Sequence, residues 1–148
     1  MESVAAQATP TTGAAASLNF KLILALSMFG LAMSIATVFL IPSSVEPIFW
    51  LVIFAICAYV IAKRAPSKLF LHGLLVSLVN SVWITGAHIA FADSYLAHHP
   101  KEASMMAKMP MPDSPRLMML LTGPVVGLVS GLVLGLFSFI AGKLVKRS

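Results

Sequence analysis

Residues 117–142 read LMMLLTGPVVGLVSGLVLGLFSFIAG, a stretch that contains no Asp, Glu, Lys or Arg. A helix that crosses the hydrocarbon core of a bilayer needs roughly 20 apolar residues, and this run is longer than that. Three further charge-free runs precede it, at residues 22–41, 47–62 and 69–92. The helices of a soluble core alternate polar and apolar faces, so four such runs predict a chain that lies in a membrane.

The composition indicates the same class. Apolar residues make up 59% of the 148 residues, charged residues only 10%, and the mean hydropathy is +0.95, far from ordinary soluble usage. We therefore expect an all-α integral membrane protein whose single domain covers residues 20–148, preceded by a disordered cytoplasmic tail at residues 1–19, which are rich in Ala, Thr and Ser. The predicted antiparallel transmembrane helices lie at about residues 20–41, 45–63, 68–92 and 116–143.

The distribution of basic residues predicts the orientation of these helices. Lys and Arg concentrate on the cytoplasmic side of membrane proteins. With four spans, seven of the ten basic residues fall on one side: Lys21, Lys63, Arg64, Lys68, Lys143, Lys146 and Arg147. We expect an inner (plasma) membrane protein with both termini cytoplasmic. The net charge of +5 then suits an anionic leaflet better than a nucleic acid.

The links between the runs carry helix-start signals. Ser43 and Glu46 have capping-box spacing before the second run. In the long third link, proline at position 100 favours a helix start and predicts a short interfacial helix over residues 100–109. Pro115 after Ser114 predicts the start of the last span. The single cysteine, Cys57, excludes an intrachain disulfide.

Small residues recur along one face of the last run. They are Gly123, Gly127, Gly131, Gly135, Ser138 and Gly142. Each glycine costs a helix about 1 kcal/mol relative to alanine, so this glycine zipper needs a compensating contact, and small residues let another helix approach closely in lipid. We expect packing within the chain against the first run, with a subunit interface as the alternative. The first run offers Ser27, Gly30, Ser34 and Thr37.

Polar residues gather on one side of the third run, whereas His72 faces away from them. They are Ser77, Asn80, Ser81, Thr85 and His88. An amide near the middle of a bilayer needs a hydrogen-bond partner, so this side is expected to face protein or water. An interhelical polar seam is the favoured interpretation, and a hydrophilic path or small-ligand pocket is the alternative. Proton-coupled transport would normally place a carboxylate at this depth, and the run has none.

The third link is rich in histidine and methionine. The candidate metal ligands are His98, His99, Met106, Met109 and Met111. Imidazole and thioether groups suit soft ions such as Cu(I), and the segment resembles methionine-rich segments of extracytoplasmic copper-handling proteins. The alternative is an interfacial helix that lays its methionines on the lipid surface.

In length, span layout and glycine-rich last helix, the chain resembles small four-span bacterial inner-membrane proteins that carry a domain of unknown function. That resemblance implies no activity. The favoured function is non-enzymatic: an accessory or assembly protein that acts through helix contacts, as a homo-oligomer or with another membrane protein. An extracytoplasmic copper-binding protein or small permease is the alternative. A lipid-active enzyme that uses His88, Asp93 and Arg116 is a third hypothesis.

Overall fold

The computed structural model describes residues 17–145, and within them the chain forms six helices. Four of these helices are long and apolar enough to cross a membrane, which confirms the predicted class of multi-span helical protein. Residues 1–16 of the predicted tail lie outside the described residues. The helices are α1 (Phe20–Phe39), α2 (Glu46–Arg64), α3 (Leu69–Ala90), α4 (Ala92–His98), α5 (Pro100–Met106) and α6 (Pro115–Leu144).

The helix boundaries follow the proline and charge signals closely. α5 begins at Pro100 and α6 at Pro115, because proline fits a first helical turn, where its missing N–H costs nothing. The prediction is wrong in two details. α5 ends at Met106, short of the expected residue 109, and the chain turns at Phe91 to form α4, a helix not expected from the sequence.

The predicted capping box at the start of α2 is also wrong. Val45 holds the N-cap position, and no described side chain caps the helix there. Ser43 instead donates a hydrogen bond to Glu102 Oε2 in α5, at 2.8 Å. Glu46 Oε1 accepts from Trp50 Nε1, one turn further along α2, at 3.1 Å. Glu46 thus bonds to a neighbour within its own helix, whereas spacing along the chain does not reveal the partner of Ser43.

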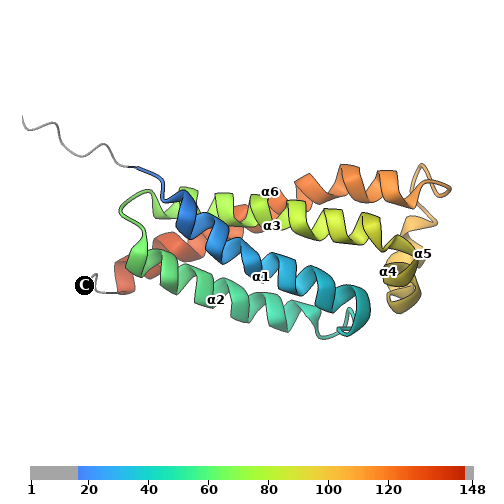
Figure 1. Ribbon diagram of the computed structural model, residues 1–148, viewed down its shortest axis with the longest axis horizontal. Coiled ribbons are helices and arrows are strands. Elements are labelled where there is room, and N and C mark those ends of the chain that lie inside the picture. The colour runs from blue at the N-terminus through green and yellow to red at the C-terminus, as the bar shows by residue number, and fades with distance from the viewer. Residues whose placement is uncertain (1–16, 146–148) are drawn as a thin grey trace, which may run out of the picture.

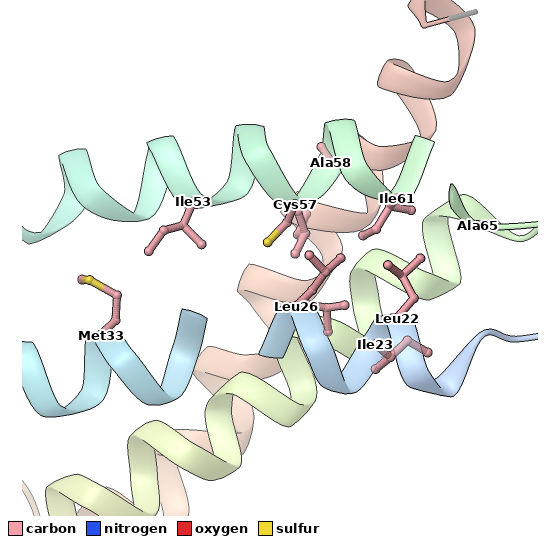
Figure 2. Packing of buried hydrophobic residues seen from close by; sticks show 11 residues of the cluster. Leu22, Ile23, Leu26, Met33, Ile53, Cys57, Ala58, Ile61 and Ala65 are labelled. Carbon is pink, nitrogen blue, oxygen red and sulfur yellow. The ribbon is translucent and has the colours of Figure 1, made fainter. Parts of the chain in front are cut away.

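The main hydrophobic cluster lies toward the end of the bundle where α1 begins and α2 ends. Figure 1 shows the start of α1, the link from α2 to α3 and the end of α6 at this end, with α4 and α5 at the other. Figure 2 shows the side chains of α1 and α2 that meet in the cluster. Cys57 and Ile61 of α2 are fully buried there, as is Leu134 of α6. The largest cluster of buried apolar side chains therefore joins the helices near this end of the bundle.

The glycine face of α6 packs on α3. Gly73 and Gly135 bring the two backbones together, because a β-carbon on Gly73 would lie 2.8 Å from Gly135 Cα. As residue numbers rise along α6, those of the α3 neighbours fall. The further neighbours are Thr85 at Gly123, Ser81 at Gly127, Leu74 at Gly131, Phe70 at Gly135 and Leu69 at Gly142. Ser138, buried on the same helix, donates to Leu134 O at 2.7 Å.

The first span is therefore the wrong partner for this face. The small residues of α1 also face α3: Gly30 lies against Asn80, and Thr37 Oγ1 lies 3.2 Å from His88 Nε2. α3 carries small or polar residues on two sides, so it sits between α1 and α6 and contacts both. The sequence shows two small-residue faces, and the pairing of each with α3 follows only from the fold.

Candidate functional site: a cleft between α2, α3 and α6

A cleft of about 940 Å³ lies between α2, α3 and α6. Residues of α4 and α5 line one end of it, which we call its outer end. Ligand pockets usually have volumes of about 300–1,000 Å³, so this cleft is large for such a small chain. Trp50 and Phe54 of α2 line one side, and Val126 and Val133 of α6 line another. The walls are therefore apolar and aromatic.

The arrangement of the core explains why the cleft is open. The second half of α2, with Cys57 and Ile61, joins the hydrophobic cluster, whereas Ile53 is the sole residue of its first half that is buried there. On α6, Gly123 and Gly127 allow the close approach to α3, because a β-carbon at either position would overlap Thr85 or Ser81 of α3. The first half of α2 therefore stands away from the α3–α6 pair.

The α3 side of the cleft, its floor, carries two buried polar groups without partners. Asn80 is 3% exposed and Ser77 is 2% exposed. Among the described residues, neither the Asn80 amide nor the Ser77 hydroxyl has a hydrogen-bond partner. An unsatisfied polar group in an apolar interior costs roughly 1–3 kcal/mol. Two of them side by side on one wall of a cleft indicate a place where a polar partner binds.

At the outer end, three aromatic rings form a stack. The ring centroids of His88 and Tyr95 are 3.9 Å apart, and those of Tyr95 and His99 are 4.3 Å apart. Thr37 Oγ1 donates to Met33 O at 2.9 Å, so the contact between His88 Nε2 and Thr37 Oγ1 is one in which the histidine donates. The stack thus ties α3 to α4 and to the start of α5.

Charged side chains surround this outer rim. Glu46, Lys101 and Glu102 all line the cleft near Tyr95. Burial raises the pKa of the Tyr95 phenol, and the nearby Glu46 and Glu102 carboxylates raise it further. Tyr95 is therefore a neutral hydroxyl at physiological pH. With one cation against two carboxylates, the rim carries a net negative charge.

All five residues of the predicted polar seam line the cleft. Asn80 and Ser77 form the floor, Ser81 and Thr85 also touch the α6 glycine face, and His88 reaches the outer rim. His72, which faces away from them, is fully buried. Its Nε2 accepts from the Asn19 backbone N–H at 3.0 Å, and its Nδ1 lies 3.1 Å from Lys68 O.

The candidate metal ligands do not share one environment. His98 is exposed and its Nδ1 donates to Ser94 O at 2.8 Å. His99 is fully buried, and its Nδ1 donates to Tyr95 O at 2.9 Å. Met106 lines the cleft, whereas Met111 is 37% exposed. Met109 is half-buried in the link after α5. Copper binding by this set stays a prediction without an assembled site.

Of the three residues of the lipid-active hypothesis, the structure brings Asp93 and Arg116 together but not His88. Asp93 Oδ2 forms an exposed ion pair with Arg116 Nη2 at 3.2 Å. Arg116 Nε donates to Ile89 O at 3.2 Å. His88 instead contacts Thr37 and Tyr95. Within the described residues, no group of three His, Cys, Asp or Glu side chains could hold a metal ion.

Part of the site carries no sequence signal. Nothing in the sequence marks Trp50, Phe54, Tyr95 or Glu102 as site residues, and Glu46 is predicted there only as part of a capping box. They come together only because α2 stands away from α3 while α4 and α5 fold over the outer end.

Comparison of the chain with models of protein families, with curated proteins and with solved structures finds no match.

Proposed function

We propose that this protein binds a small amphipathic molecule from the bilayer in the cleft between α2, α3 and α6, without catalysing a reaction. The observation that carries the proposal is the cleft of about 940 Å³ with Asn80 and Ser77 unpaired among its described surroundings. An apolar pocket with a few convergent polar groups is the usual form of a small-molecule site. The apolar walls suit a hydrocarbon part, and the floor suits a polar group.

The position of the cleft in the bilayer follows from the charges. We place the start of α1 and the end of α6 on the cytoplasmic side of the inner membrane, with the four long helices crossing in alternating directions. Lys21, Lys63 and Lys143 support this placement. They belong to the start of α1, the end of α2 and the end of α6, and these three helix ends lie at the same end of the bundle in Figure 1. The cleft rim and α5 then lie at the outer interface.

Access from the lipid is supported by the exposed wall residues. Leu51 is 59% exposed, Val126 is 64% exposed and Val129 is 58% exposed, yet all three line the cleft. The cleft therefore opens on the side of the bundle between α2 and α6. In a membrane that side faces acyl chains, so an amphipathic molecule can enter from the bilayer.

The assembly role has less support from this geometry. It relies on the α6 glycine face to receive a partner helix, and that face lies against Phe70, Leu74 and Ser81 of α3. A second copy of the chain would have to use a different surface. We therefore place ligand binding ahead of assembly.

Tryptophan quenching tests the proposal, because the chain has only two tryptophans. Trp50 lines the cleft, and Trp83 donates to Ser27 Oγ of α1 at 3.3 Å, on another side of α3. The full chain with Trp83→Phe, in lipid nanodiscs, is titrated with 11-bromoundecan-1-ol, whose bromine quenches nearby indole. We expect saturable quenching of Trp50 that unbrominated undecanol reverses.

The matched control is the Trp50→Phe protein, in which only Trp83 fluoresces. Trp83 is 37% exposed, so it reports the probe dissolved in the bilayer. Its quenching is expected to rise in proportion to the probe concentration, and unbrominated undecanol should not reverse it. Equal, non-saturable quenching of both proteins would rule out binding in the cleft.

A further inference from the structure

We infer that the buried end of the ligand is an uncharged group that both donates and accepts hydrogen bonds, a hydroxyl or a primary amide, and that it pairs with Asn80 and Ser77. This inference rests on the proposed function and specifies the chemical class of the ligand. It follows from which atoms of the floor lack partners, what surrounds them, and where the charged residues of the cleft lie.

The Asn80 side chain needs a partner that both donates and accepts hydrogen bonds. Its Nδ2 donates and its Oδ1 accepts, and within the described structure both atoms are buried and unpaired. Gly30 of α1 lies behind the amide, so closely that a β-carbon there would overlap it. A partner therefore has to come from the cleft side, which Asn80 also lines. A group that only accepts would leave Oδ1 unsatisfied.

Ser77 differs from most hydroxyl side chains of the long helices. Ser81, Ser130 and Ser138 each donate to a carbonyl three or four residues earlier in their own helix. Such a bond satisfies a hydroxyl without any outside partner. Ser77 is more buried than Ser81 and Ser130 but makes no such bond to any described residue. Its hydroxyl therefore adds a second donor and acceptor to the floor, one helical turn from Asn80.

The charges around the cleft exclude an ionic group at this depth. The residues that line the floor between Ser77 and Thr85 carry no charge. Burying an ion without a partner of opposite charge is costly in a membrane interior. The rim, with Glu46 and Glu102 against Lys101, is unfavourable for an anionic head group as well. A fatty-acid carboxylate or a phospholipid phosphate is therefore a poor match to both ends of the cleft.

A series of probes that differ only at one end tests the inference. The Trp83→Phe protein is titrated with bromoalkyl compounds of equal length that end in a hydroxyl, a primary amide, a methyl ester or a sulfonate, with concentrations corrected for partitioning into the nanodisc. We expect the hydroxyl and amide probes to saturate at concentrations about tenfold below the ester, and the anionic sulfonate probe to bind least well. Comparing the first two probes shows which of the two groups the floor prefers.

Two variants connect the preference to the floor. Asn80→Leu removes the amide at similar volume, and Ser77→Ala removes the hydroxyl in a residue that suits a helix. Both should lower the affinity for the hydroxyl probe, by about tenfold for Asn80→Leu, and leave the ester nearly unchanged. If Asn80→Leu does not fold, Ser77→Ala and the probe series in the Trp83→Phe protein still show whether the floor prefers a group that both donates and accepts hydrogen bonds.

The outcomes separate the two proposals. If all four probes saturate with equal affinity and neither variant changes those affinities, the cleft binds amphiphiles but the inference about the buried group is wrong. If no probe saturates, the proposed function itself fails.

Discussion

The backbone of Gly30 in α1 lies directly against the side chain of Asn80 in α3. A β-carbon at position 30 would come within 2.6 Å of Asn80 Cγ and 2.8 Å of Asn80 Cβ. Rotating the amide cannot relieve the second contact, because Cβ is fixed by the backbone. This glycine therefore sets the distance between α1 and α3 at the level of the cleft floor.

Gly30→Ala should lower the stability of the protein. Alanine favours a helix by about 1 kcal/mol over glycine, but the overlap with Asn80 should cost about 1–3 kcal/mol, so the net change is a loss. The thermal unfolding temperature in detergent measures it. Gly86→Ala is the matched control, because no described atom outside its own helix lies within 4 Å of its β-carbon position. A higher unfolding temperature for both variants would contradict the close packing of α1 on α3.

The second prediction concerns the contact between α3 and α6. A β-carbon on Gly73 would lie 2.7 Å from Leu134 O, and one on Gly135 would lie 2.9 Å from Phe70 O. Both neighbours are backbone atoms, which cannot move without separating the helices. Gly73→Ala and Gly135→Ala should each destabilise the protein by about 1–3 kcal/mol, measured by titration with sodium dodecyl sulfate.

Gly142→Ala separates packing from helix propensity in this experiment. The nearest obstacle to its β-carbon is the end of the flexible Leu69 side chain, which can turn away. We expect this variant to match or slightly exceed the parent protein in stability. The α3–α6 packing would be contradicted if Gly73→Ala and Gly135→Ala behaved in the same way.

The long helices could be predicted from the sequence because one local property, the absence of charge over a bilayer's length, decides them. Prolines such as Pro100 and Pro115 then fix where helices begin. The partner of the glycine face could not be predicted in this way. Small residues show that a helix approaches, but α1 and α3 both offer them, and only three-dimensional packing chooses between the two.

Only part of the cleft could be predicted from the sequence. Its polar floor is visible in the sequence, because Asn80 and its neighbours share one helix face. Its existence depends on α2 standing away from α3, and its rim depends on α4, a helix that hydropathy does not reveal. Ser43 pairs with Glu102 across 59 residues of chain, so spacing along the sequence could not identify that bond.

The third prediction concerns His72, which holds the start of α1. Its Nε2 accepts the Asn19 N–H at 3.0 Å, and the Asn19 side chain in turn accepts from Leu22 N at 3.0 Å. His72→Phe keeps an aromatic ring and leaves the Asn19 N–H without its acceptor, at a cost of about 1–3 kcal/mol. We expect faster hydrogen exchange at Asn19 and its neighbours in α1 and little change in α6.

His98→Phe is the control for this exchange experiment, because His98 is exposed and, among the residues that the structure describes, bonds only to Ser94 O within its own helix. It should leave exchange at the start of α1 unchanged. Equal exchange at Asn19 in the parent and the His72→Phe protein would show that the histidine does not hold this segment.

The last prediction concerns the bond between Ser43 and Glu102, which ties the link after α1 to α5 at the cleft rim. A double-mutant cycle with Ser43→Ala and Glu102→Ala should give a coupling energy of about 1 kcal/mol, as expected for a hydrogen bond to a carboxylate that is only half-buried. The comparison pair is Asp93 and Arg116, whose side chains are 92% and 55% exposed. Because solvent screens an exposed ion pair, its coupling should be smaller and should fall as salt is added. A stronger coupling for Asp93 and Arg116 than for Ser43 and Glu102 would mean that the outer end of the bundle is held at α6 and not at the rim.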